Sequence, residues 1–253
     1  MIGGDLADAA PWRAALAGVD TVVHLAAATG KVRRTDHFEI IRNGTRRVLE
    51  AAQAAGVRRV LYVSSVAVVY RDRPYYHYAQ AKADAEQLVG TSGLDYLIVR
   101  PTLVLGPGSA PLAGLRRLAL LPIPLIFGSG KPLVQPVHVD DLARLLAAAL
   151  KLPRWGGSAI TVGGPDTVSL DQLLLRIRAT ARPDGRKPVH LPLAPARLVL
   201  SLLEPILLPL LPFTAGQLAF FANPAVAEPH PLLAELPVPT LGLAEMLDAR
   251  IPE

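Results

Sequence analysis

Residues 43–68, NGTRRVLEAAQAAGVRRVLYVSSVAV, join a helix-forming segment to an apolar strand through a single glycine. Segment 44–56 contains four alanines and two arginines, both good helix formers, and its apolar residues lie mostly on one side. Gly56 stands where a glycine commonly ends a helix. The Val- and Leu-rich residues 58–66 that follow are typical of a strand covered on both faces. The stretch therefore predicts one helix–strand unit of a parallel sheet.

The same alternation continues on both sides of this unit. Strands are expected at 21–27, 58–66, 94–101 and 158–164, and helices at 44–56, 78–90 and 137–150. This order predicts an α/β fold with a Rossmann-like, doubly wound parallel sheet, whose ligand crevice lies beyond the carboxyl ends of the strands. After about residue 165 the chain changes to short helices, prolines and loops. We therefore expect a main domain at 1–164 and a small irregular lobe at 165–253.

Composition excludes several classes of function. The 253 residues carry a net charge of +5, and the basic residues are not interleaved with aromatic ones, so a nucleic-acid partner is not expected. There is no cysteine and the six histidines are dispersed, so neither disulfides nor a metal site is expected. The first fifteen residues contain acids and no long apolar run, which argues against an export signal and favours a cytoplasmic protein.

Residues 191–213, LPLAPARLVLSLLEPILLPLLPF, are as long and apolar as a membrane span. Five prolines, Arg197 and Glu204 would kink such a span and leave charges in hydrocarbon, so no transmembrane helix is expected. The segment predicts a broken, buried helix pair in the C-terminal lobe. The alternative is an apolar patch that rests on a membrane or on a partner protein.

Segment 63–82, VSSVAVVYRDRPYYHYAQAK, contains residue types suited to proton transfer. Tyr78 and Lys82 are four residues apart, which places both on one face of a helix, where an ammonium group would lower the pKa of the phenol. Ser65, at the end of the preceding strand, could hydrogen-bond a substrate oxygen beside that phenol. Alone, this spacing also occurs by chance in many helices.

The ordered set of segments around these residues is more specific. The chain resembles the extended and atypical short-chain dehydrogenases, which include nucleotide-sugar epimerases, dehydratases and hydroxysteroid dehydrogenases. The segments that carry the resemblance are GGDLAD (3–8), GVDTVVHLAA (18–27), 43–68, YAQAKADAEQL (78–88), LIVRPTLVLGPG (97–108), QPVHVDDLA (135–143) and GGPDTVSLDQLL (163–174). The resemblance implies NAD or NADP as cofactor and a catalytic triad of Ser65, Tyr78 and Lys82.

The same resemblance implies a set of cofactor contacts. These residues are Asp5, Leu6, Leu25, Ala26, Ala27, Ser64, Lys82, Pro101, Thr102 and Leu103. Asp5 and Leu6 match the adenine contact, 25–27 the lining beside the adenosine ribose, Lys82 the contact with the nicotinamide ribose, and 101–103 the wall under the nicotinamide. Without that context the simpler interpretations would be preferred, namely a turn at Asp5, core packing for the alanines and a strand end at Pro101.

Three features set the chain apart from the family pattern. No glycine-rich turn of the GxxGxxG kind follows a first strand, and the chain starts at what resembles the third strand, so we expect an incomplete dinucleotide domain and a truncated gene model. Ile41 stands where relatives carry an asparagine. The short interval between Ser65 and Tyr78 resembles the atypical branch that includes accessory subunits of respiratory complex I, some members of which have no demonstrated turnover.

These observations leave two functions open. The first is an NAD(P)-dependent oxidoreductase or epimerase in which Tyr78 exchanges the proton, Lys82 lowers its pKa and Ser65 orients the oxygen. Its substrate would be a nucleotide sugar or an apolar carbonyl or alcohol compound. The second is a non-catalytic, dinucleotide-binding accessory or assembly protein that docks on a protein or membrane through its apolar lobe. Under either function, the protein could form a homodimer.

Overall fold

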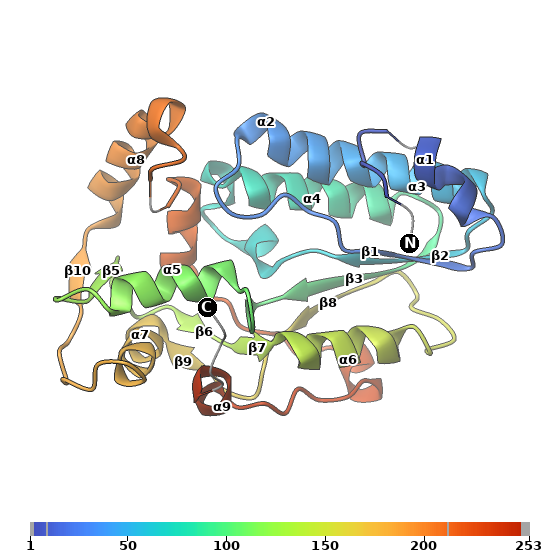
Figure 1. Cartoon of the computed structure of the whole chain (residues 1–253). Coiled ribbons are helices and arrows are strands. Elements are labelled where there is room, and N and C mark those ends of the chain that lie inside the picture. The colour runs from blue at the N-terminus through green and yellow to red at the C-terminus, as the bar shows by residue number, and fades with distance from the viewer. Residues whose placement is uncertain (1–2, 9, 212, 249–253) are drawn as a thin grey trace.

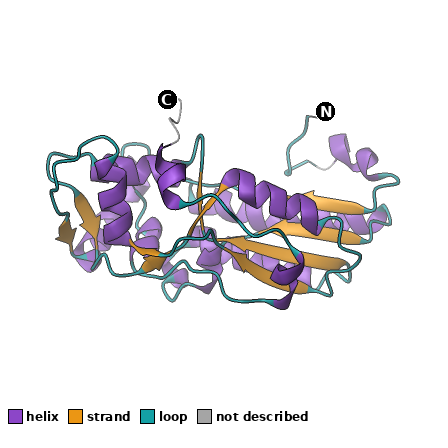
Figure 2. Ribbon diagram, turned by 90° about the horizontal axis from the view of Figure 1, so that it is seen from below, coloured by secondary structure: helices purple, strands orange, loops and turns teal. Residues whose placement is uncertain are grey.

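The computed structural model describes residues 3–8, 10–211 and 213–248, which form a main sheet with covering helices and a smaller lobe at one end (Figures 1 and 2). The main sheet has the order β1-β2-β3-β8, and all its strands are parallel. Their bounds are Thr21–His24, Arg59–Val63, Asp95–Pro101 and Ser158–Val162. The predicted α/β fold with a parallel Rossmann-like sheet is thereby confirmed.

Helices cover both faces of this sheet (Figure 1). On one face lie α2 (Arg34–His37), a π-helical segment (Phe38–Asn43), α3 (Gly44–Ala54) and α4 (His77–Gly90). On the other lies α6 (Val139–Ala149). Because side chains alternate along a strand, Val60 and Tyr62 of β2 pack under α3 and α4, whereas Leu61 packs toward α6. Gly56 has a φ of +73° at the end of α3, as a glycine cap requires.

The lobe at the other end of the molecule has its own small strands and helices. Its elements are α5 (Ala110–Ala119), β5 (Leu125–Phe127), β6 (Leu133–Val134), β9 (Val168–Ser169), α7 (Leu170–Ala179), β10 (Val189–Leu191), α8 (Leu193–Leu207) and a 3₁₀ segment (Gly216–Phe221). β10 pairs with β5 in parallel, so the lobe also contains residues that precede the predicted boundary at 164. That boundary stays a prediction.

Shorter elements connect these parts. They are α1 (Ala10–Arg13), 3₁₀ turns at Ala14–Leu16, Val66–Val69, Arg73–Tyr75 and Pro231–Glu235, the parallel pair β4 (Leu103–Leu105) and β7 (Pro136–His138), and α9 (Leu243–Asp248).

The prediction of a broken, buried helix pair at 191–213 is wrong. The structure has one helix, α8, in which only Leu200 is buried. Pro192 and Pro195 stand before and within the first turn, where the missing N–H costs nothing, and Pro205 lies inside the helix near its end. Within the described residues, no helix is long and apolar enough to cross a membrane.

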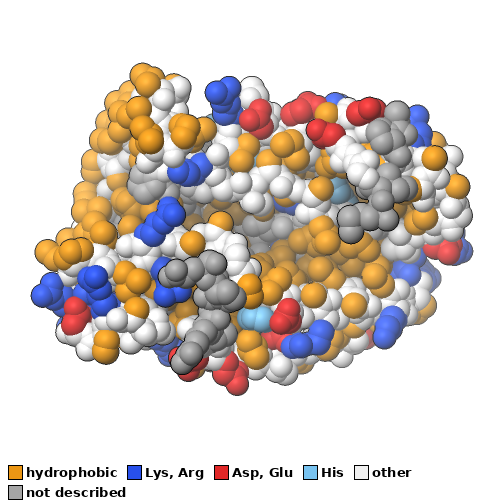
Figure 3. Space-filling view, in the orientation of Figure 1, with side chains coloured by type: hydrophobic (Ala, Val, Ile, Leu, Met, Phe, Trp, Pro, Cys, Tyr) orange, Lys and Arg blue, Asp and Glu red, His pale blue; other side chains and the backbone are white. Residues whose placement is uncertain are grey.

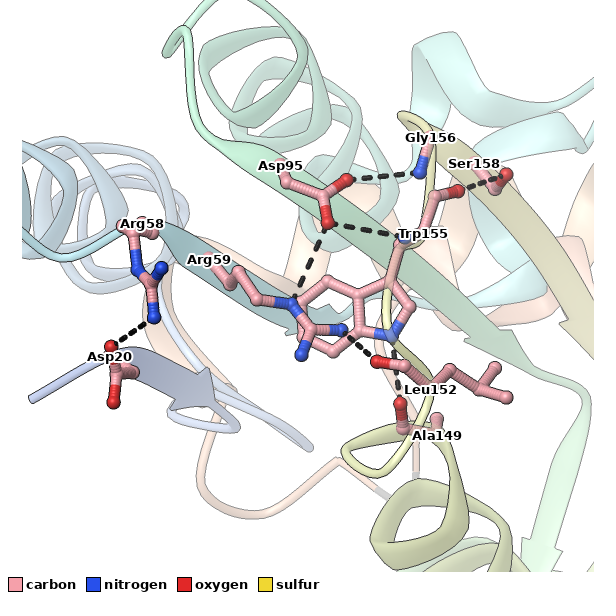
Figure 4. A network of polar contacts seen from close by, with 9 residues as sticks. All are labelled: Asp20, Arg58, Arg59, Asp95, Ala149, Leu152, Trp155, Gly156 and Ser158. Carbon is pink, nitrogen blue, oxygen red and sulfur yellow. Dashed lines mark hydrogen bonds and ion pairs between the residues drawn. The ribbon is translucent and has the colours of Figure 1, made fainter.

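A polar network fixes the amino ends of the strands (Figure 4). The carboxylate of Asp95 on β3 accepts hydrogen bonds from the backbone N–H groups of Trp155 and Gly156 at 3.1 and 2.9 Å. The Arg59 guanidinium of β2 lies 3.8 Å from the centre of the Trp155 ring and 3.6 Å from Asp95, which pairs with it. The Trp155 indole N–H donates to the carbonyl of Ala149 at 2.8 Å. Adjacent strands are thus locked at the amino end, and the opposite end is left for a ligand site.

Candidate active site

Strands β1, β2 and β3 end next to one another because they are parallel and in register. His24, the last residue of β1, is opposite Tyr62, and Val63, the last residue of β2, is opposite Val99. Ser64 and Ser65 therefore leave the sheet beside Pro101, which ends β3. The helix α4 crosses above this edge on the face that carries α3.

Ser64 and Ser65 have different environments although they are neighbours. The N–H of Ser64 donates to the Val99 carbonyl at 2.7 Å, which continues the sheet by one residue. Its hydroxyl is buried and has no hydrogen-bond partner among the described residues. The Ser65 hydroxyl caps the 3₁₀ turn that follows by accepting from the N–H of Ala67 at 3.1 Å. That acceptor role leaves the Ser65 proton free to be donated to another oxygen.

Tyr78 lies in the first turn of α4 and is half-buried. Its ring packs edge-on against His37 at 5.9 Å between centroids and against Tyr76 at 5.5 Å. Burial raises the pKa of Tyr78 to about 12, and its hydrogen bond with Ser65 opposes part of that rise. The structure therefore joins two of the three predicted triad residues directly, with the phenol protonated at neutral pH.

Lys82, one helical turn further along α4, is 2% exposed. Its ammonium group donates to the Val63 carbonyl at 2.6 Å and lies 4.7 Å from the centre of the Tyr62 ring. Burial lowers the pKa of Lys82 to about 8, although Glu86 opposes this change. Because the ammonium is directed at Val63 and Tyr62, the expected lowering of the Tyr78 pKa by Lys82 is not found, and burial decides the state of the phenol.

A buried polar chain beside Lys82 was not predicted from the sequence. The Thr45 hydroxyl donates to the Ile41 carbonyl at 2.5 Å, so it can only accept from Nε2 of His24, which is 2.9 Å away. The imidazole of His24 also stacks on Tyr62 at 5.4 Å. Burial and the nearby Lys82 lower the pKa of His24 to about 4, so it is neutral at pH 7. The only sequence signal for this polar chain was a histidine, His24, within the first predicted strand.

Ile41, where the family resemblance predicts an asparagine, contributes to this polar chain through its backbone. Its side chain is fully buried in the core beneath α3 and α4, and its carbonyl accepts the Thr45 proton.

The residues matched to the adenosine end lie at the open edge of β1. Leu25 is 58% exposed and Ala26 is also exposed, whereas Ala27 is partly covered. The carboxylate of Asp5 accepts from the N–H of Ala7 at 2.9 Å, and Leu6 packs against Gly44 at the start of α3. Asp5 and Leu6 are thus positioned beside α3, separate from the Ser65 and Tyr78 pair.

The residues matched to the nicotinamide wall follow β3. The Thr102 N–H donates to the Val162 carbonyl at 2.9 Å, and its hydroxyl donates to the Gln135 carbonyl at 2.5 Å. Pro101 and Leu103 are buried on either side of it. These bonds hold the segment rigidly at the level of Ser65.

Comparisons with known proteins agree with this architecture. A protein-family model described as NAD(P)H-binding matches residues 1–153. The chain belongs to this family. It also has relatives and structural neighbours among the NAD-dependent epimerases and dehydratases of the short-chain dehydrogenase type. The resemblance to complex I subunits and the truncated gene model stay predictions.

Two relatives are named as reductases. The chain is 33% identical over 157 residues to the ceramide reductase of Caulobacter vibrioides, a match covering 62% of this chain and 48% of that protein. It is 30% identical over 212 residues to the 2-alkyl-3-oxoalkanoate reductase of Stenotrophomonas maltophilia, covering 71% and 62%. The chain thus spans about half to two thirds of the length of these two reductases.

Solved structures give the same fold. The protein MoeE5, solved with UDP-glucose and NAD, has a TM-score of 0.61 at 27% identity, over 75% of this chain and 70% of that one. A UDP-glucose 4-epimerase of Thermotoga maritima has a TM-score of 0.71 over 98% and 82%, at 18% identity, which shows the fold alone.

The site residues fit one part of an NAD(P) cofactor. The unpartnered Ser64 hydroxyl and the Lys82 ammonium are of the chemistry that hydrogen-bonds a ribose, and the exposed apolar Leu25 and Ala26 suit a ring at the edge of β1. Within residues 3–8, 10–211 and 213–248, no strand followed by a glycine turn and a helix precedes β1.

Proposed function

We propose that this protein is an NAD(P)-dependent reductase that adds a proton to the oxygen of a carbonyl compound, with Tyr78 as the proton donor. The observation that carries the proposal is the position of the Tyr78 phenol, in the first turn of α4, near the Ser65 hydroxyl at the carboxyl end of β2. Both hydroxyls would face one substrate oxygen, so that Ser65 orients it while Tyr78 protonates it.

The state of Tyr78 is compatible with its role as a proton donor. Burial raises the pKa of Tyr78 to about 12, so the phenol holds its proton at neutral pH and can donate it to the oxygen as negative charge develops there.

Lys82 and its neighbours would hold the cofactor and set the charge of the site. The cofactor, when bound, supplies the hydride. Lys82 would bond the nicotinamide ribose, Ser64 would add a second hydroxyl contact, and Asp5 with Leu6 would lie at the adenine end. The neutral His24 fixes the Tyr62 ring on which the Lys82 ammonium rests, so the ammonium is held in one place.

An apolar carbonyl compound is the substrate class that we propose. The lobe beside Tyr78 has an apolar core, and Tyr76 and Tyr78 pack against it together with Phe127 and Phe213. The two reductases at 30–33% identity carry names of lipid-like compounds, ceramide and an alkyl-oxoalkanoate, which supports this class. A nucleotide sugar, as in the complex of MoeE5, is the alternative.

The experiment has a binding arm and a turnover arm. NADH and NADPH are titrated calorimetrically into the protein, and oxidation of the bound nucleotide is then followed with a long-chain ketone, an alkyl-oxoalkanoate and UDP-4-keto-glucose. We expect binding of at least one nucleotide and turnover with an apolar carbonyl. Binding without turnover on any carbonyl would leave the non-catalytic accessory protein as the function, and absence of binding would refute the reductase.

A further inference from the structure

The outward face of α8 and the turn after it form an exposed apolar ridge. Leu198, Leu202 and Ile206 of α8 and Leu210 of the turn follow one another at intervals of four residues and are 61%, 67%, 80% and 80% exposed. Figure 1 shows α8 projecting from the end of the molecule, and Figure 3 shows hydrophobic side chains covering that end. Soluble surface helices normally place charged residues on this side. The apolar face therefore needs a cover other than water.

The two charged side chains of the segment have partners within the protein. Arg197 pairs with Asp72 at 3.3 Å, and the Glu204 carboxylate accepts from the N–H of Ala215. The Ser201 hydroxyl donates to the Leu198 carbonyl at 2.8 Å. Both charges of the helix are thus turned inward, and the ridge presents no charged side chain.

A distant lysine holds the segment that follows α8. Lys31, on the loop after β1, donates to the carbonyls of Pro209 and Leu211 at 2.9 and 2.8 Å. These bonds tie the segment after α8 to the main sheet.

Basic residues flank the apolar surface. The apolar surface continues from α8 to the exposed Val189 of β10 and to the exposed Ile123. The Val189 N–H donates to the Pro124 carbonyl, which brings the two residues close together. Lys187 lies two residues before Val189. Arg186 donates to the Pro122 carbonyl at 2.8 Å and lies 3.6 Å from the carboxylate of Asp184, which leaves Lys187 as the basic group without an acidic partner among the ion pairs of the described residues. Figure 3 shows Lys and Arg side chains at the end of the hydrophobic surface. An aliphatic surface with a basic border matches acyl chains beneath anionic head groups.

The chemistry of the ridge favours lipid over protein. Protein interfaces place aromatic residues, Arg and directional hydrogen bonds at their centre, which fix the orientation of the partner. The ridge has only aliphatic side chains and no free polar group. We propose that α8 lies in the plane of a bilayer containing anionic lipid and docks the protein on its surface. This inference does not depend on the proposed reductase.

The test is co-flotation of the 253-residue protein with vesicles of phosphatidylcholine alone or mixed with phosphatidylglycerol. The variant Leu202→Gln/Ile206→Gln changes two side chains that lie outside the core, so its fold should be retained, which circular dichroism checks. Val238→Gln is the matched control, because Val238 is 74% exposed and lies outside α8. Lys187→Gln removes one basic group from the border.

We expect the protein to float with the mixed vesicles and Val238→Gln to behave identically. The double variant should bind at least about tenfold more weakly, the effect of losing one to two buried aliphatic side chains. Lys187→Gln should bind more weakly on the mixed vesicles, with the loss reduced at high salt. The proposal is overturned if the wild type binds neither vesicle, or if the double variant binds as well as the wild type. It is also overturned if sedimentation shows a dimer that only the double variant dissociates while no vesicle is bound, because the ridge is then a contact between copies.

Discussion

Replacing Lys82 by methionine should stabilise the fold while it abolishes the proposed reaction. Lys82 is 2% exposed, and burial lowers its pKa from the ordinary 10.5 to about 8. Methionine has a similar length and no charge to desolvate. The difference in the free energy of unfolding between the variant and the wild type therefore measures how much the buried ammonium destabilises the protein when no cofactor is bound.

The magnitude follows from proton linkage. At pH 7 both the folded and the unfolded chain carry the proton, and the fall in pKa from 10.5 to about 8 corresponds to about 3 kcal/mol of destabilisation. Loss of the hydrogen bond to the Val63 carbonyl offsets about 1.5 kcal/mol of this gain. Lys82→Met should therefore raise the free energy of unfolding at pH 7 by about 1–2 kcal/mol. The unfolded chain binds more protons between pH 8 and 10.5, so wild-type stability rises through this window and the advantage of the variant disappears by about pH 10.

Urea unfolding of the two proteins at pH 7 and pH 10 measures this difference. Lys151→Met is the control, because Lys151 is exposed and its replacement should change stability by less than about 0.5 kcal/mol at both pH values. A Lys82→Met protein that is less stable than the wild type at pH 7 would refute the reasoning. A stability difference that is the same at pH 7 and pH 10 would refute it equally.

Further predictions concern the rest of the account. Trp155→Ala should lower the free energy of unfolding by about 3–5 kcal/mol, since it removes the ring that carries Arg59 and leaves a cavity, and thermal unfolding measures this. Because the pKa of His24 falls to about 4 in the fold, the unfolded chain binds the proton first as pH drops from 6.5 to 4. Between pH 6.5 and pH 4 the free energy of unfolding of the wild type should therefore fall by about 3 kcal/mol more than that of a His24→Asn variant, as urea unfolding at the two pH values measures. An equal fall in both proteins would contradict this. Ser65→Ala should lower kcat by about a hundredfold with little change in nucleotide affinity measured by calorimetry.

Much of the main sheet could be predicted because its signals are local. The strands at 21–24, 59–63 and 95–101 are apolar runs rich in Val, Leu and Ile, and Gly56 marks the helix end between two of them. The strand predicted at 58–66 ends three residues early, at Val63. The N–H of Ser64 makes the last hydrogen bond to β3, and the Ser65 side chain then caps the 3₁₀ turn at Val66–Val69. That Tyr78 and Lys82 lie on one face of α4 could likewise be predicted, because residues four apart in a helix are one turn apart.

The features that could not be predicted depend on distant contacts. The chain of His24, Thr45 and Tyr62 joins residues from two strands and a helix, and only the register of β1 on β2 brings them together. The direction of the Lys82 ammonium follows from the same packing. The exposure of α8 was missed because Leu-rich sequence is normally buried, and nothing in the local sequence shows that the lobe covers only Leu200.

The most direct test of the central claim compares Tyr78→Phe with Tyr75→Phe in NAD(P)H-dependent reduction of the carbonyl compound that the protein turns over. Tyr75 is 63% exposed and stands three residues before Tyr78, so its variant controls for the loss of a phenol near the site. We expect Tyr78→Phe to lower kcat by about a thousandfold while nucleotide affinity is kept, and Tyr75→Phe to be as active as the wild type. A Tyr78→Phe protein that retains wild-type kcat would show that another group delivers the proton.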